Sequence, residues 1–164
     1  MLKLLACFAI IAVCSYGGFF YSKKYRRREK FYFDALNFCN AYKANLGFLK
    51  LNLKELCAAF KADNSGDFAD FLCNALNGEI TAECEVKDNL SCLTFLSAEQ
   101  VNFINRFVAI LGRGDASSQS LQAEGYKQQI ETYLKQAKEE RARKGVLCAK
   151  LGIVTGVFLS ILII

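Results

Sequence analysis

The chain has 164 residues, 53% of them hydrophobic, and contains no proline, histidine or tryptophan. The absence of histidine excludes the usual catalytic triads, zinc sites with imidazole ligands and imidazole pH switches. The net charge of +5 is unevenly spread, with +6 on residues 1–30, −4 on residues 31–137 and +3 on residues 138–164. A nucleic-acid-binding protein is expected to carry its basic charge on the folded domain. The distribution therefore argues against nucleic acid as a partner.

The first predicted element is an apolar segment at residues 1–22. It contains an uncharged run from Leu4 to Tyr21, and a basic cluster follows at once. Such a run is near the lower limit for a helix that crosses a hydrocarbon core of about 30 Å. A cleaved signal peptide is the alternative, but the positive cluster follows the apolar run and no small-residue cleavage motif is evident. We therefore expect an uncleaved transmembrane anchor.

The middle region, residues 23–144, has apolar residues at helical spacing. Its first helix is expected to continue directly from the apolar segment to about residue 49. Asn52 is typical of an N-cap for the next helix. A turn at residues 64–66 precedes a further helix that begins at Asp67.

The second half of the middle region continues this pattern. Residues 79–95 predict another helix, and Ser97 with Gln100 forms a capping-box pattern before the next one. Gly112 is expected to end that helix, and a long helix from Asp115 runs into the last apolar segment. The sequence therefore predicts an all-α fold: a cytoplasmic bundle of about six helices between two transmembrane helices.

Residues 145–164 form the second apolar segment, which as a helix is about 30 Å long. Lys150 is its single charged residue and can extend toward the basic side. Gly152 and Gly156 lie one turn apart, and such a pair lets a second helix approach closely within a membrane. We expect either a packing role for this pair or a chance occurrence, since glycine is common in membrane helices.

Basic residues flank both apolar segments and predict the orientation of the chain. Clusters of Lys and Arg are retained on the cytoplasmic side of membranes. We call these residues the basic collar: Lys23, Lys24, Arg26, Arg27, Arg28 and Lys30 before the bundle, and Arg141, Arg143 and Lys144 after it. The middle region is therefore expected in the cytoplasm, with both ends of the chain on the other side.

Neither the cysteines nor the clustered acidic residues predict a catalytic or metal-binding site. The eight cysteines include no C-x-x-C pair and mostly lie on apolar stripes, which favours small hydrophobic side chains in a reducing compartment over a metal site or disulfides. Residues 63–99 contain eight acidic residues and one basic residue. This stretch predicts either a solubilising face or a docking surface for a basic partner. We expect no catalytic residue, cofactor or metal.

Three stretches of the sequence resemble the stage III sporulation protein AB family of endospore-forming bacteria. The opening MLKLL and the closing KLGIVTGVFLSILII are similar to the ends of that family. The most specific match is FLSAEQVNFINRFVAILGRGDASSQ, which carries the family pattern at Phe107, Leu111, Gly112, Asp115 and Gln119. Residues 53–95 match poorly.

The resemblance implies a non-enzymatic membrane subunit of the channel that links mother cell and forespore during sporulation. Its cytoplasmic domain would be similar to the helical F-domain of type II secretion platform proteins. It would lie in the mother-cell membrane facing the forespore, with other channel subunits and their secretion-type ATPase as partners and with no small-molecule substrate. The alternative is a membrane-tethered helical sensor or ligand-binding module, which a large internal pocket with convergent polar groups would favour.

Overall fold

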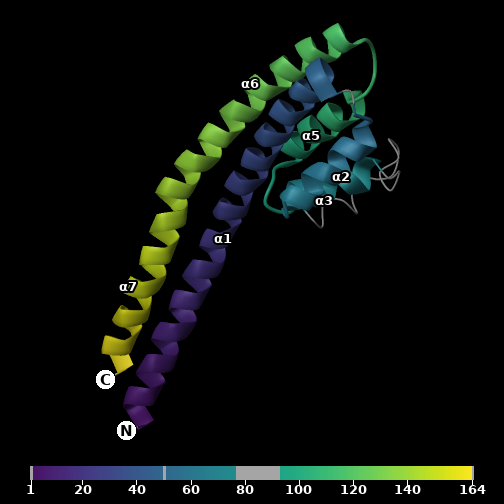
Figure 1. Cartoon of the computed structure of the whole chain (residues 1–164). Helices are drawn as coiled ribbons and strands as arrows, with labels where there is room; N and C mark the ends of the chain where they lie inside the picture. The colour runs from purple at the N-terminus through teal and green to yellow at the C-terminus, as the bar shows by residue number, and fades with distance from the viewer. Residues whose placement is uncertain (1, 50, 77–92, 164) are drawn as a thin grey trace. The chain divides into compact units, whose positions relative to one another are not determined.

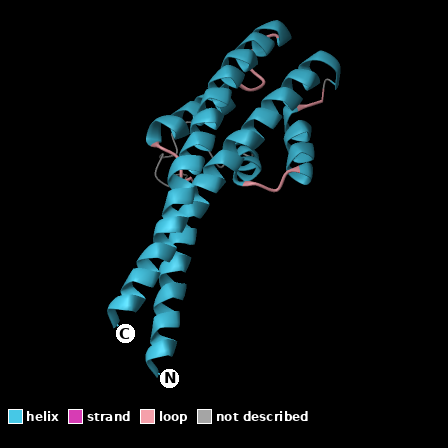
Figure 2. Cartoon of the chain, turned by 90° about the vertical axis from the view of Figure 1, so that its left-hand side faces the viewer, coloured by secondary structure: helices cyan, strands magenta, loops and turns pink. Residues whose placement is uncertain are grey.

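The computed structural model describes residues 2–49, 51–76 and 93–163 (Figure 1). Over these residues the chain is all-helical and contains no strand (Figure 2). The α-helices are α1 (Leu2–Ala44), α2 (Leu53–Asp63), α3 (Asp67–Leu76), α5 (Ala98–Ile110), α6 (Ala116–Glu140) and α7 (Val146–Ile163). Two π-helical segments follow α1 and α6, at Asn45–Leu49 and Arg141–Gly145. The predicted all-α class is confirmed.

The chain divides into two compact units. The first comprises Met1–Glu29 and Gln136–Ile164, and the second comprises Lys30–Lys135. Within the first unit, α7 runs beside the N-terminal part of α1, as both Figure 1 and Figure 2 show. The second unit holds α2, α3, α5, the C-terminal part of α1 and most of α6.

Both predicted membrane anchors are helical over their described residues, in α1 and in α7. Among the residues that the structure describes, however, no helix is long and apolar enough to cross a membrane. The structure thus shows α-helix from Leu2 through the first segment and from Val146 to Ile163 in the second, and it does not show that either crosses a bilayer.

The end of α1 differs from the expected regular helix. Its last turn widens into the π-helical segment Asn45–Leu49, and the side chain of Asn45 closes the loop that follows. The Asn45 amide Nδ2 donates to the carbonyl of Leu51 at 3.0 Å, and its Oδ1 accepts from the Leu51 N–H at 2.8 Å. The two bonds place Asn52 as the N-cap of α2, where its N–H donates to the Glu55 carboxylate at 3.3 Å. The predicted start of α2 is confirmed.

The turn at residues 64–66 and the start of α3 at Asp67 are also as expected. A Cβ at position 66 would lie 2.5 Å from Asp34 Oδ2 on α1, so any other residue there would force the Asp34 carboxylate to move. The helix predicted over residues 79–95 falls mostly outside the described residues, and its last three residues are not helical. A turn there joins the Leu96 N–H to the Leu93 carbonyl at 2.9 Å and buries both side chains.

Aromatic side chains from four helices form the core of the second unit. Phe38 of α1 lies at its centre, with ring centroids 5.3 Å from Phe60, 5.9 Å from Phe68 and 6.4 Å from Phe107. Each ring is 7% exposed or less. Burial of a phenylalanine contributes about 1.5–3 kcal/mol, and edge-to-face contacts add roughly 0.5–1.5 kcal/mol. The core therefore fixes the positions of α1 and α5, and α5 leads into the connection that carries most of the family-signature residues.

Candidate functional site

The residues that carry the family pattern lie at the connection between α5 and α6. Phe107 and Leu111 are buried beneath it, Gly112 and Asp115 are exposed in it, and Gln119 is half-buried on the first turns of α6. The structure therefore brings all five predicted residues to one end of the second unit.

Two glycines of this connection have a positive φ. Gly112 has φ of +76° and Gly114 has φ of +94°, a region that other residues adopt at an energetic penalty. α5 ends at Ile110, and the Arg113 N–H donates to its carbonyl at 3.2 Å. A Cβ on Gly112 would contact Leu53 Cδ2 at 3.4 Å. Glycine at position 112 therefore ends α5 and reverses the chain, as the sequence predicts.

A buried tyrosine on α1 holds this connection in place. The Gly112 N–H donates to Tyr42 Oη at 3.0 Å, and Tyr42 Oη donates to Gln119 Oε1 at 2.6 Å. Gln119 Nε2 in turn donates to the Gly114 carbonyl at 2.7 Å. We call these four residues the Tyr42 clasp. It joins α1, the connection and α6 through three consecutive hydrogen bonds.

Burial raises the pKa of the Tyr42 phenol, although the hydrogen bond from Gly112 acts in the opposite direction. A tyrosine that is 4% exposed needs a partner for its hydroxyl, and the clasp supplies two. The sequence pattern predicted a helix through residue 42 but missed this role of its tyrosine. The role could have been predicted from the side chain itself, because a buried phenol requires a polar partner elsewhere in the fold.

Asp115 caps the beginning of α6. Its carboxylate accepts from the Ser117 hydroxyl and, at 3.3 Å, from the Ser118 N–H. These hydrogen bonds, that of Ser117 first, hold the pKa of Asp115 below its ordinary value. The carboxylate thus stabilises a helix end and remains ionised. The expected cap is confirmed.

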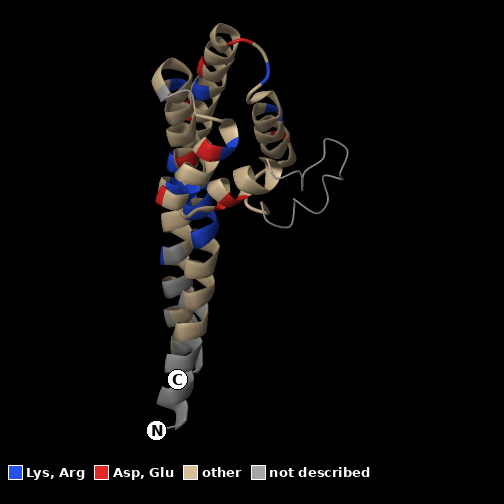
Figure 3. Ribbon diagram, turned by 45° about the vertical axis from the view of Figure 1, so that its right-hand side comes forward, with Lys and Arg blue, Asp and Glu red and all other residues tan. Residues whose placement is uncertain are grey.

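Two arginines of the basic collar form ion pairs within the first unit; Figure 3 marks the Lys and Arg positions along the ribbon in blue. Arg28 on α1 pairs with Glu140 at 2.7 Å, and Arg141 pairs with Glu29 at 2.7 Å. These reciprocal ion pairs connect α1 with the end of α6 inside the first unit. The collar therefore has a role in helix packing that sequence reasoning missed.

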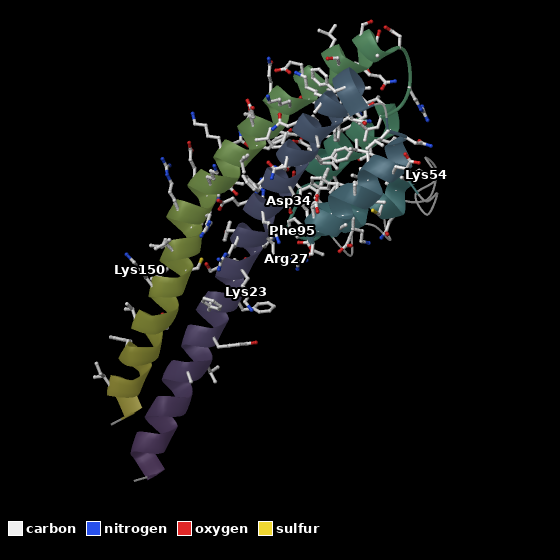
Figure 4. All side chains as sticks on the ribbon, viewed as in Figure 1. Lys23, Arg27, Asp34, Lys54, Phe95 and Lys150 are labelled. Carbon is white, nitrogen blue, oxygen red and sulfur yellow. The ribbon has the colours of Figure 1, made fainter. Side chains whose placement is uncertain are left out.

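Other collar residues are exposed at the surface. Lys23 lies over the ring of Phe19 with Nζ 5.6 Å from the centroid, and Figure 4 shows Lys23 and Arg27 on α1. In the second unit, Lys30 donates to the Ser65 carbonyl at 3.0 Å. The remaining exposed members of the collar are Lys24, Arg26, Arg143 and Lys144.

The glycines of the last apolar segment are described in part. Gly156 is buried, whereas the surroundings of Gly152 lie outside what the structure describes. The structure adds a close contact that the sequence did not predict. A Cβ on Gly145 would lie 3.5 Å from Ser22 Oγ and 3.7 Å from the Cβ of Tyr25, both on α1. Small residues thus line part of the contact between α1 and the segment before α7.

The described cysteines are free thiols, and one acidic residue of the predicted stretch forms an ion pair within the protein. Cys39, Cys57, Cys73 and Cys148 are free thiols, and burial raises the pKa of both Cys39 and Cys57 to about 12. Buried neutral thiols are inert packing groups. Of the predicted acidic stretch, Asp70 pairs with Lys61 at 3.0 Å, while residues 77–92 lie outside the described part. In that part, no group of three or more Cys, Asp or Glu side chains is arranged to hold a metal ion.

Over its described residues the chain is an all-helical protein in which the turn between α5 and α6, with Gly112 and Gly114, is held by Tyr42 of α1. The family model for stage III sporulation protein AB matches residues 3–164. The chain therefore belongs to the stage III sporulation protein AB family and is a sporulation-stage protein. The resemblance seen in the sequence is confirmed. No curated protein and no solved structure matches the chain.

Proposed function

We propose that this chain is a non-enzymatic membrane subunit of the mother cell–forespore channel complex and that its helical domain serves as a docking platform for assembly. The observation that carries the proposal is the family match over residues 3–164. The expected partners are other channel subunits, including the secretion-type ATPase.

Membrane attachment is supported by the sequence on both sides of the bundle. Residues 4–21 carry no charge, residues 145–164 carry only that of Lys150, and each run is flanked by collar residues. Lys150 is exposed on α7 and points away from α1 (Figure 4), from where its long side chain can extend to the membrane surface. In this proposal the protein lies in the mother-cell membrane facing the forespore, with the bundle in the cytoplasm.

The close packing beneath the α5–α6 connection supports a scaffold role. A cavity beside Tyr42, Phe107 and Leu111 has a volume of about 10 Å³, close to the minimum that accommodates a single water molecule. The polar groups that converge there hydrogen-bond to one another in the Tyr42 clasp. The site holds helices in position, which is the property that a docking platform requires.

The proposal is tested in sporulating cells of the source organism. Deletion of the gene should block sporulation after engulfment begins, and a tagged full-length copy should restore it. Solubilised in mild detergent, the tagged protein should co-purify with other channel subunits. Normal sporulation of the deletion strain, or recovery of the tagged protein without any channel subunit, would contradict the proposed function.

A further inference from the structure

A groove of about 700 Å³ runs between α5 and α6 on the second unit. Phe103 of α5 and Tyr126 and Tyr133 of α6 line it, and all three are half-buried. The ring centroid of Phe103 lies 5.3 Å from that of each tyrosine. The three rings therefore form a continuous aromatic surface that connects the two helices and remains accessible from outside.

A glycine in the middle of α6 also lines this groove. Gly125 is exposed, and a Cβ added to it would meet nothing within 4 Å. Glycine inside a helix is less favourable than alanine because the unfolded chain gains more conformational freedom. The folded chain gives no compensating reason for glycine at this position. Close approach of another molecule's backbone does give one.

Two charged residues of α5 also line the groove. Glu99 and Arg106 line the groove, are exposed and lie seven residues apart, on the two sides of Phe103 in the sequence. Seven residues are about two helical turns, so opposite charges stand near opposite ends of the aromatic surface. A partner of complementary pattern carries a basic residue near Glu99 and an acidic residue near Arg106.

We infer that this groove binds an amphipathic helix of another channel subunit, an inference that rests on the proposed function. The apolar stripe of the partner helix packs on Phe103, Tyr126 and Tyr133, and its backbone approaches Gly125. Tyrosine and arginine are enriched in such interfaces. α5 has 13 residues, so a partner helix of about three to four turns matches its length of about 20 Å.

Photocross-linking in sporulating cells identifies the occupant. A photoreactive amino acid replaces Gln129, which lines the groove, in the otherwise native full-length chain. The same substitution at Glu131, an exposed residue of α6 outside the groove, is the control. We expect the Gln129 probe, and not the Glu131 probe, to cross-link to a helix of another channel subunit, mapped by mass spectrometry. Cross-linking to a protein outside the channel, to a second copy of this chain or to lipid, or no cross-linking at all, would overturn the inference.

A matched pair of variants then tests the role of the glycine. Gly125→Leu fills the groove while improving helix propensity, so its thermal midpoint should not fall. It should weaken cross-linking, and binding of a synthetic peptide of the mapped helix to the purified full-length protein, about tenfold or more. Glu131→Leu adds the same side chain outside the groove and should leave both unchanged. Unaltered peptide binding by Gly125→Leu would contradict the inference.

Charge reversal distinguishes a docked helix from a non-specific apolar contact. Glu99→Arg should weaken binding of the same peptide, and reversing the facing basic residue of the peptide should restore it. One outcome is that the deletion strain fails to sporulate while the Gly125→Leu strain sporulates normally, and the Gly125→Leu protein still co-purifies with channel subunits and binds the peptide. In that case the groove is not the docking site, and the proposed function stands. If the deletion strain sporulates normally, the proposed function itself fails.

Discussion

At the scale of single residues, the Tyr42 hydroxyl is the group on which the α5–α6 connection depends. Tyr42→Phe removes one hydroxyl and leaves the Gly112 N–H and Gln119 Oε1 without their partner. We expect the free energy of unfolding to fall by about 1–2 kcal/mol, measured by denaturant titration of the full-length protein in detergent. Tyr126→Phe removes a hydroxyl outside the clasp, so it should have little effect. Equal effects of the two variants would show that the clasp adds no stability.

A second residue-scale prediction concerns Asp34, a buried carboxylate on α1. Its Oδ2 has no hydrogen-bond partner among the described residues. Burial raises the pKa of Asp34 above its ordinary value of 3.8, nearby Asp67 raises it further, and Lys30 lowers it. Because the folded state then binds a proton more readily than the unfolded state, this group favours folding at low pH. That contribution is lost as the pH rises from about 4 through the raised pKa.

Asp34→Asn should remove this loss. The stability of the variant relative to the native chain should therefore increase from about pH 4 toward neutral pH, measured by denaturant titration at a series of pH values. Asp63→Asn, the same substitution at an exposed position, is the control variant. A constant difference between the native chain and Asp34→Asn across this range would show that the carboxyl does not titrate differently on folding.

At the scale of elements, the end of α5 depends on the left-handed backbone at Gly112. Gly112→Val places a β-branched side chain at a φ of +76° and should destabilise the protein by about 1 kcal/mol or more. Gly125→Ala, at a helical glycine with open space around it, should instead stabilise by about 0.5–1 kcal/mol. Thermal unfolding followed by circular dichroism measures both, and opposite signs are required. A shift in the same direction for both variants would rule out the conformational explanation.

The pairing of α1 with the end of α6 is the second element-scale feature that mutations can test. Arg28 and Glu140 form an ion pair with side chains 18% and 31% exposed. Arg28→Glu and Glu140→Arg should each destabilise the first unit, and the double variant should recover part of the loss. The coupling free energy from the double-mutant cycle should be about 0.5–1 kcal/mol. Lys24→Glu combined with Glu140→Arg is the control, and similar coupling there would argue against a specific pair.

The sequence predicted contacts between residues close along the chain and missed contacts between residues far apart along it. The Ser97–Gln100 capping box is present, with bonds of 3.1 Å and 3.4 Å between residues three positions apart. Both hydrogen bonds of the capping box form within one helical turn, so the local sequence alone specifies them. Tyr42 and Gln119 are 77 residues apart, and Arg28 and Glu140 are 112 apart. Such pairs depend on how helices pack, which the pattern of a single helix does not contain.

At the scale of the whole molecule, the proposed topology places the bundle and the two ends on opposite sides of a membrane. In a variant without native cysteines, a cysteine at Ser65, which is exposed in the turn before α3, should not react with a membrane-impermeant thiol reagent added outside intact cells. A cysteine added after Ile164 should react. Both should react once the membrane is permeabilised. Strong external labelling at position 65 would refute the topology inferred from the basic collar.

The long separation between Tyr42 and its partners has a consequence for synthesis on the ribosome. At roughly 5–20 residues per second, about 4–15 seconds pass between translation of Tyr42 and that of Gln119, 77 residues later. During that interval α1 emerges with Phe38, which has no exposed surface in the finished protein, before Phe107, whose ring centroid lies 6.4 Å from that of Phe38, has been made. The nascent chain therefore presents an aromatic surface that a chaperone or the insertion machinery must shield until α5 and α6 are made.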